Sequence, residues 1–256
     1  MKIAIIPDTQ VKPDKPTEHL LWAAQYLIDK KPDVIVMIGD WWDMESLSSY
    51  DKGKKSFEGR RYIRDIEAGN EAMSLFIDPI KREINRLIKN KKKSWSPRLI
   101  FTLGNHEQRI ERAIESESML DGTIGYKDLN LDDWEVFSFL EPVVIEDVAF
   151  CHYFTSGIMG RPVSSARALL TKKMMSSVMG HVQDKDIASG KRADGKRLTA
   201  LFVGIFYQHD EDYLGPQGNN SWRGIWMLNE VSNGSFDEMP VSLNFLRDRY
   251  GKRVAK

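Results

Sequence analysis

Cysteine is almost absent from the sequence, since the 256 residues contain only Cys151. A single cysteine excludes a disulfide within the chain. Structural disulfides belong to oxidising compartments and are rare in the reducing cytosol. The sequence therefore predicts a cytoplasmic protein whose fold depends on its core rather than on covalent cross-links.

Long apolar runs and an excess of one charge are also missing. The longest apolar run, ALFVGIF, is far shorter than the ~20 residues that span a bilayer, and Pro7 and Asp8 come too early for a signal peptide. We therefore expect no membrane partner. The net charge is +0, so no global field attracts nucleic acid. Any affinity for a polyanion has to come from local basic clusters, such as residues 52–55.

The hydrophobic pattern that is present predicts an α/β fold. Residues 2–40 contain two apolar runs, KIAIIPD and DVIVMIGD, on either side of a segment with apolar residues at helical spacing. The second run is apolar on both faces, which is typical of a parallel strand covered by helices. This region is therefore predicted to be a βαβ unit, with His19 on the solvent side of its helix.

The rest of the chain is predicted to continue as one domain over residues 1–256. A loop over 46–61 should precede a long helix over 66–88 that Pro79 kinks. Residues 120–135 look irregular, 163–173 look helical, and 207–212 look like a polar loop. Further strands are expected at RLIFTLGN, at a hairpin in VVIEDVAFCHYF, and at SSVMGH, LTALFVGIF, GIWMLNEV and VSLNF. There is no internal repeat and no linker.

Several apolar runs end in side chains that bind metals. In an open α/β sheet, ligands bind beyond the carboxyl ends of the strands. We therefore expect one rim to carry Asp8, Gln10, Asp40, Asp43, Asn105, His106, His152, His181 and Gln183. Each motif alone is weak, because a Gly-Asp pair is usually a turn and a lone histidine in a strand is usually a core residue.

Taken together, the set has a coherent chemistry. Converging carboxylates repel each other unless a cation lies between them. Imidazole nitrogens and amide oxygens complete the shell of a divalent transition metal. A set of this size can hold two metals ~3.5–4 Å apart, which is the arrangement that clamps an in-line displacement at phosphorus.

The order D-x-[HQ], G-D-x-x-D, G-N-H-E, H, G-H-x-[HQ] between Asp8 and Gln183 resembles the calcineurin-like metallophosphoesterase superfamily. GDWWD and GNHE, in this order and spacing, are its most specific parts. The resemblance implies two mixed β-sheets packed face to face as a sandwich, with helices on the outside. It also implies hydrolysis of a phosphate ester.

The resemblance further implies a role for each matching residue. Asp40 would bridge two metals. Asp8, Gln10 and Gln183 would hold the first metal, and Asn105, His152 and His181 the second. His106 would be the general acid that protonates the leaving oxygen while a metal-bound hydroxide attacks. Asp43 would orient His106, and Glu107 would support the site without binding a metal.

Gln10 and Gln183 depart from the pattern, because histidine is usual at both positions. The first site would then offer only oxygen ligands, which favour Mn²⁺ or Mg²⁺ over Zn²⁺. We expect Mn²⁺ to be preferred, with Fe²⁺, Ni²⁺ and Zn²⁺ also able to bind, and we expect the first site to be the weaker. A scaffold without activity is a further alternative, but Asp40, Asn105 and His106 are all retained.

The substrate is less well defined than the reaction. A phosphodiester in nucleic acid or a nucleotide is favoured because the basic loop over 52–64 lies near the rim. Trp41 and Trp42 could stack on a base there, although such tryptophans more often pack in the core. Arg109 could contact phosphate or form a surface ion pair. A phosphomonoesterase remains the alternative, and the sequence does not predict an oligomeric state.

Overall fold

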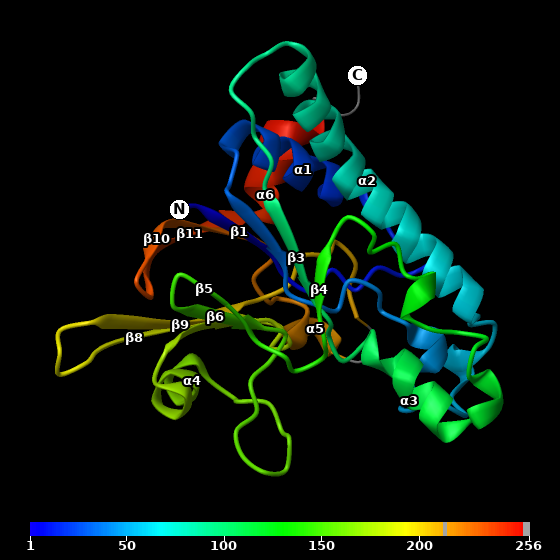
Figure 1. Cartoon of the computed structure of the whole chain (residues 1–256). Coiled ribbons are helices and arrows are strands. Elements are labelled where there is room, and N and C mark those ends of the chain that lie inside the picture. Colours follow the sequence, from blue (N-terminus) through cyan, green and yellow to red (C-terminus); the bar gives the residue numbers. More distant parts are fainter. Residues whose placement is uncertain (212–213, 253–256) are drawn as a thin grey trace.

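The computed structural model describes residues 1–211 and 214–252. Two mixed sheets pack face to face, and helices cover both outer faces (Figure 1). The fold class predicted from the sequence is therefore confirmed. Three apolar clusters fill the layers, namely one between helices and the first sheet, one between the sheets, and one under the helix on the second sheet.

The first sheet has six strands, of which four are parallel neighbours. In spatial order they are β11 (Ser235–Ser242), β10 (Gly224–Ser232), β1 (Ile3–Ile6), β2 (Val34–Met37), β3 (Arg98–Thr102) and β4 (Glu135–Phe137). β10 runs antiparallel to β1 and β11 runs antiparallel to β10. The predicted βαβ unit consists of β1, α1 and β2.

The second sheet has five strands, and its centre is again parallel. In spatial order they are β5 (Val143–Ile145), β6 (Val148–Cys151), β7 (Ser176–Met179), β9 (Arg197–Val203) and β8 (Lys185–Lys191). The predicted hairpin is β5–β6, with its turn at Glu146 and Asp147, both at positive φ. β8 was not predicted, because its sequence is mostly exposed and carries no apolar alternation.

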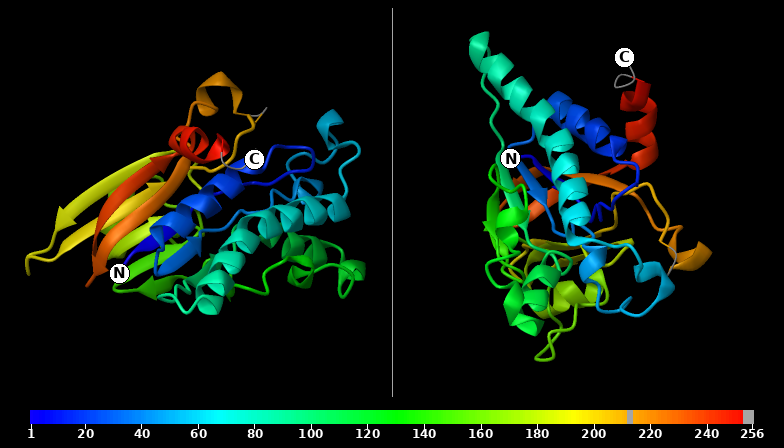
Figure 2. Two further views of the ribbon diagram at one scale, coloured as in Figure 1. Left: turned by 90° about the horizontal axis from the view of Figure 1, so that it is seen from above. Right: turned by 90° about the vertical axis from the view of Figure 1, so that its right-hand side faces the viewer.

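The helices are arranged on the outside of the sandwich (Figure 2). They are α1 (Glu18–Lys30), α2 (Tyr62–Lys89), α3 (Gln108–Ser116), α4 (Ala166–Lys173), α5 (Gly215–Gly218) and α6 (Leu243–Leu246). α1 and α2 pack on the first sheet and α4 packs on the second. α2 continues through Pro79. Among the described helices, none combines the length and apolarity needed to cross a bilayer.

Alternation along the central strands explains why they need cover on both faces. Ile3 and Ile5 of β1 join the cluster between the sheets, whereas Ala4 and Ile6 face the helices. Side chains of a strand alternate between faces, so a run that is apolar throughout is stable only when both faces are buried. Full burial of each such isoleucine contributes about 1.5–3 kcal/mol.

Two local predictions are wrong. VSLNF is not one strand, because β11 ends at Ser242 and the Ser242 side chain caps α6 by accepting a hydrogen bond from the backbone N–H of Phe245. His19 does not face solvent. It is 1% exposed, and its Nε2 lies 2.9 Å from the carbonyl oxygen of Phe206, to which it donates. His19 shares a helix face with buried Ala23 and Leu27.

Candidate metal centre

The carboxyl ends of five strands meet at one edge of the sandwich. Strands β1, β2 and β3 of the first sheet are parallel, as are β6 and β7 of the second. The residues that follow them are, in the same order, Asp8, Asp40, Asn105, His152 and His181. Pairing of the strands thus brings together residues that are up to 173 positions apart, as in the hydrogen bond from the His181 backbone N–H to the Asp8 carboxylate.

The backbone at this edge adopts conformations that side chains usually disfavour. Gln10, Asp40 and His181 have φ of 40, 52 and 65°. Each such residue costs about 1–3 kcal/mol unless the surroundings hold it. Two glycines allow close approach, because a Cβ on Gly104 or Gly180 would collide with a carboxylate oxygen of Asp40 or Asp8, respectively. The glycines of the GNHE and GH motifs therefore make room for the two acids.

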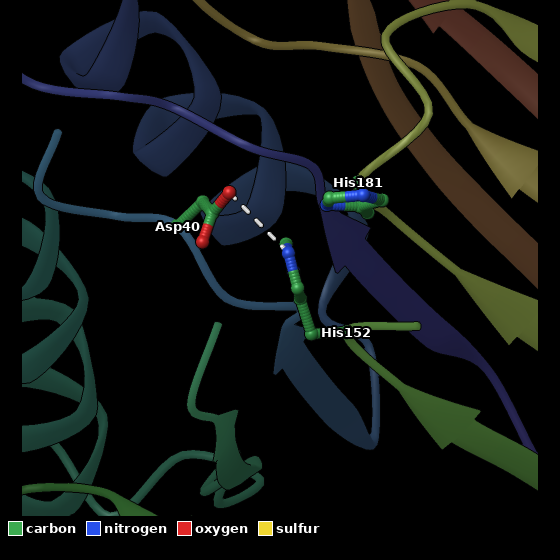
Figure 3. Close-up of side chains that lie close together, drawn as sticks. All are labelled: Asp40, His152 and His181. Carbon is green, nitrogen blue, oxygen red and sulfur yellow. Dashed lines mark ion pairs between the residues drawn. The ribbon is translucent and has the colours of Figure 1, made fainter. Parts of the chain in front are cut away.

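Three potential ligands point at a common centre (Figure 3). Asp40, His152 and His181 each offer one atom, and these atoms all lie within 4.8 Å of one another. Asp40 Oδ2 lies 3.3 Å from His152 Nε2. Asn105 Oδ1 lies beside both rings, 2.9 Å from His152 Nε2 and 2.7 Å from His181 Nδ1.

The polarity of these atoms fits a divalent cation. His152 Nδ1 donates to the carbonyl oxygen of Ile38 at 2.9 Å, so Nε2 is the nitrogen that becomes an acceptor when the ring is neutral, the form that binds a metal. That nitrogen faces the carbonyl oxygen of Asn105 and the carboxylate of Asp40, which are also acceptors. Acceptors that converge in this way, with a histidine oriented by its other nitrogen, are typical of a metal site. The residues predicted for the second metal are therefore brought together.

Asp8, which is predicted to bind the first metal, lies next to this group. Asp8 is fully buried and accepts a hydrogen bond from the backbone N–H of His181 at 3.1 Å. Burial raises the pKa of Asp8 to about 7, with His152 opposing this and Asp40 adding to it. The Gln10 backbone N–H donates to the Asp40 carbonyl at 2.9 Å. Gln183 is half-buried, two residues beyond His181.

His106 lies at the rim of the same centre. Its Nδ1 is 2.7 Å from Asp43 Oδ1, and its Nε2 is 3.7 Å from Asp40 Oδ2. Burial lowers the pKa of His106, but the Asp40 and Asp43 carboxylates outweigh burial and raise it. Arg109 Nη2 donates to His106 Nε2 at 3.1 Å, and Arg109 Nη1 donates to the carbonyl oxygen of Asp43 at 2.8 Å. Asp43 and Arg109 thus both contact the predicted acid.

Glu107 organises the backbone around the two motifs. Its buried carboxylate accepts hydrogen bonds from the N–H groups of Asp40 at 3.0 Å, Trp41 at 2.7 Å, Trp42 at 3.2 Å and Gly104 at 2.8 Å. Hydrogen bonds to a charged acceptor are stronger than neutral ones. A single side chain therefore joins the loop after β2 to the turn after β3.

Trp41 and Trp42 do not form a rim for substrate. Both side chains are 0% exposed. The Trp41 indole donates to the carbonyl oxygen of Gly69 at 3.0 Å, and a Cβ on Gly69 would overlap the Trp42 ring. The expectation that they stack on a base is therefore corrected. They pack the GDWWD loop against α2, which is the alternative that their residue type favours.

Two charged residues near His106 were missed by sequence reasoning. Lys12 and Glu211 form an ion pair next to Asp43. Glu211 lies in the segment 207–212, which was expected to be a polar loop, yet Glu211 and His209 are both buried. Asp212 of that segment lies outside the described residues. No local pattern could have indicated the pair, because its members are 199 residues apart.

Comparison with known proteins agrees with this geometry. The sequence model of the calcineurin-like phosphoesterase family matches residues 1–222. The chain belongs to this family. It is accordingly a metal-dependent phosphoesterase, and the centre at the strand ends is a candidate site for its divalent cations. The match includes every strand end that contributes to the centre.

One solved structure similar to this phosphoesterase is described as YfcE, a phosphoesterase from E. coli. The two share 12% sequence identity, with 95% of this chain and 100% of the other covered and a TM-score of 0.40. No curated protein sequence matches the chain.

Proposed function

We propose that this phosphoesterase hydrolyses phosphodiesters in nucleic acid or nucleotides, with Mn²⁺ as the preferred metal and with His106 as the general acid. The observation that carries the reaction is the group of acceptor atoms on Asp40, Asn105, His152 and His181, with His106 beside it. The single buried cysteine is consistent with action in the cytoplasm.

The chain's own residues would orient the substrate and move one proton. Divalent ions, when bound, polarise phosphoryl oxygens and activate water. As an acid, His106 would carry its proton on Nε2 while Nδ1–H donates to Asp43. A protonated Nε2 cannot accept from Arg109, so the Arg109 guanidinium would become available for a phosphate oxygen. Protonation of His106 would therefore provide the general acid and, at the same time, free Arg109 to bind a phosphate oxygen.

The loop after Asp43 supports a polyanionic substrate. It begins at the short turn Glu45–Leu47, directly after the GDWWD motif, and is tied there by Arg60, which donates to the carbonyl oxygen of Glu45 at 3.2 Å. Tyr50 is 81% exposed, and Lys52 and Lys55 are exposed without an ion-pair partner in the described part of the chain. A free aromatic ring among lysines suits stacking on a base with contacts to phosphates.

The oxygen-rich first site supports the choice of metal. Asp8, Gln10, Asp40 and Gln183 would supply only oxygen atoms, which favour Mn²⁺ or Mg²⁺ over Zn²⁺. The second site would add the two imidazoles of His152 and His181. We expect two cations per chain, the first bound less tightly than the second.

Hydrolysis assays with a panel of metals test the proposal. Bis-(p-nitrophenyl) phosphate and DNA should be cleaved with Mn²⁺, and faster than p-nitrophenyl phosphate. Asp40→Asn should abolish the activity, and His106→Ala should lower it about 10²–10⁴-fold for DNA. A preference for the monoester would instead indicate a phosphomonoesterase. Absence of metal-dependent cleavage of any of these would indicate a binding scaffold.

A separate set of variants tests the role of this loop in substrate binding. Tyr50→Ser combined with Lys52→Ser and Lys55→Ser should raise KM for DNA and flatten its salt dependence, while hydrolysis of bis-(p-nitrophenyl) phosphate stays unchanged. Lys91→Ser with Lys92→Ser removes two exposed lysines at the other end of α2 and should leave both substrates unaffected. Equal effects of the two sets would contradict a role for the loop in substrate binding.

A further inference from the structure

Backbone pairing continues beyond strands β1 and β2 and places Lys12 beside Asp43. Val11 and Trp42 form an isolated parallel bridge. The Val11 N–H donates to the carbonyl oxygen of Trp41 at 2.8 Å, and the Asp43 N–H donates to that of Val11 at 3.0 Å. Lys12 and Asp43 are the next residues in this register.

A third segment joins from the far end of the chain. Asp8 and Ile205 form another parallel bridge, and the Phe206 N–H donates to the carbonyl oxygen of Asp8 at 2.8 Å. The segment after Ile205 therefore runs alongside residues 8–12 in the same direction. At the end of this segment, the Glu211 carboxylate accepts a hydrogen bond from the Lys12 side chain.

The Lys12 ammonium is held between two carboxylates. Its Nζ lies 3.0 Å from Asp43 Oδ2 and 2.7 Å from both oxygens of Glu211. The exposed fractions of the Lys12, Asp43 and Glu211 side chains are only 13%, 10% and 5%. An ammonium has three donors, and three carboxylate oxygens occupy them. Lys12 is therefore committed to these acids rather than to substrate.

Other contacts hold Glu211 in place. His209 Nε2 donates to Glu211 Oε1 at 2.9 Å, and the His209 ring stacks on Tyr207 with centroids 4.5 Å apart. The Glu211 backbone N–H donates to Asn219 Oδ1 at 2.9 Å. The carboxylate that anchors Lys12 is thus fixed by contacts on both sides.

Asp43 divides its two carboxylate oxygens between His106 and Lys12, and Arg109 Nη1 lies 3.8 Å from Oδ1. Oδ1 lies 2.7 Å from His106 Nδ1, while Oδ2 lies 3.0 Å from Lys12 Nζ. We propose that Lys12 is a positioning residue, which fixes the Asp43 carboxylate so that Oδ1 stays aligned with His106. The proposal rests on the proposed role of His106 as general acid.

This role differs from that of an ion pair that only stabilises the fold. Without Lys12, Asp43 and Glu211 would be two buried carboxylates that repel each other. The Asp43 carboxylate would then turn away, and His106 Nδ1 would keep only the backbone carbonyl oxygen of Asp43, 2.8 Å away, as its acceptor. The loss should affect the proton transfer to the leaving oxygen, which matters most when that oxygen is a poor leaving group.

Double-mutant kinetics with two substrates test the proposal. Lys12→Met should lower kcat for a phosphodiester with a poor leaving group, such as a phenyl ester, about tenfold more than for bis-(p-nitrophenyl) phosphate. Lys12→Arg should recover most of this loss. In a His106→Ala background, Lys12→Met should change kcat less than about twofold, because residues that act through each other are not additive.

Two more variants complete the experiment. Lys15→Met changes an exposed lysine of the same segment and should behave as wild type. Glu211→Gln weakens the anchor of Lys12 and should give a smaller loss with the same dependence on leaving group. Circular dichroism shows whether Lys12→Met folds. If it does not fold, Glu211→Gln replaces it in the kinetic experiment.

The outcomes separate this proposal from the proposed function. If His106→Ala lowers kcat but the effects of Lys12→Met or Glu211→Gln add fully to it, or are equal for both substrates, the positioning role is overturned. If His106→Ala retains full activity on the poor leaving group, the assignment of the acid itself is wrong.

Discussion

His152 Nε2 lies 2.9 Å from Asn105 Oδ1, while the opposite ring nitrogen, Nδ1, donates to the carbonyl oxygen of Ile38. The two residues follow strands of different sheets. Burial lowers the pKa of His152, but the Asp40 carboxylate outweighs burial and raises this pKa to about 9. Either a proton or a metal cation can therefore lie between Nε2 and Oδ1, and a bound metal replaces the proton. This relationship gives the metal assignment a physical basis beyond the order of motifs.

The first prediction concerns thermal stability. A ligand that binds only the folded state at 100 times its Kd adds about 2.7 kcal/mol, so Mn²⁺ should raise the Tm of the chelator-treated protein by about 5–10 °C. His152→Ala should remove this shift, and differential scanning calorimetry measures it. His19→Gln, which changes a buried histidine away from the centre, should keep it. An unchanged shift in His152→Ala would mean that manganese binds elsewhere.

The second prediction concerns the two glutamines. Isothermal titration with Mn²⁺ should show one tight and one weaker binding event. Gln183→His should tighten the weaker event about tenfold, or 1.4 kcal/mol, because an imidazole is a better ligand for a divalent transition metal than an amide oxygen. Gln217→His, at an exposed position of α5, should leave both events unchanged. Two equally tight events in the wild type would argue against a weak first site.

The third prediction sets helix propensity against packing. Alanine is preferred over glycine in a helix by about 1 kcal/mol, but a Cβ on Gly69 would overlap the Trp42 ring. Overpacking of a core costs about 1–3 kcal/mol, so Gly69→Ala should be destabilising in urea unfolding. Gly157→Ala, whose added Cβ meets nothing within 4 Å, should be close to neutral. Stabilisation by Gly69→Ala would show that Trp42 moves without cost.

The fourth prediction concerns pH. Burial lowers the pKa of His19 from 6.5 to about 3, so below pH 6.5 the unfolded state binds a proton that the folded state does not. Stability should therefore fall as the pH falls from 6.5 towards 3, by about 2 kcal/mol from this group at pH 5.

His19→Gln is the matching variant, because it removes the titrating ring and retains a donor for the carbonyl oxygen of Phe206. Its free energy of unfolding should change less between pH 7 and pH 5 than that of the wild type, by about the same 2 kcal/mol. Parallel pH dependences in the two proteins would show that His19 does not titrate as its burial requires.

Some parts of the centre were predictable because a local pattern determines them. Asp8, Asp40, His152 and His181 each end a short apolar run, and parallel strands place such ends at one edge. The burial of His19 had a signal too, since residues 19, 23 and 27 share one helix face. His19 was expected on the solvent side of the helix, although its position in the helical repeat places it on the buried face.

Other parts depend on contacts that no local pattern encodes. The sequence allowed Trp41 and Trp42 to be either exposed or buried. They can be buried because Gly69 leaves space for an indole ring on α2. Lys12 meets Glu211 only because the bridge between Asp8 and Ile205 brings the segments that follow these two residues together. An ion pair between such distant residues follows from tertiary structure rather than from spacing.

The potential metal ligands come from both sheets, and this has a consequence for how the sandwich holds together. With one cysteine, the chain has no internal covalent bridge. A cation held by Asp40 and Asn105 from one sheet and by His152 and His181 from the other would tie the two halves together, as a reversible cross-link. The mechanical integrity of the molecule would then vary with the supply of metal in its surroundings.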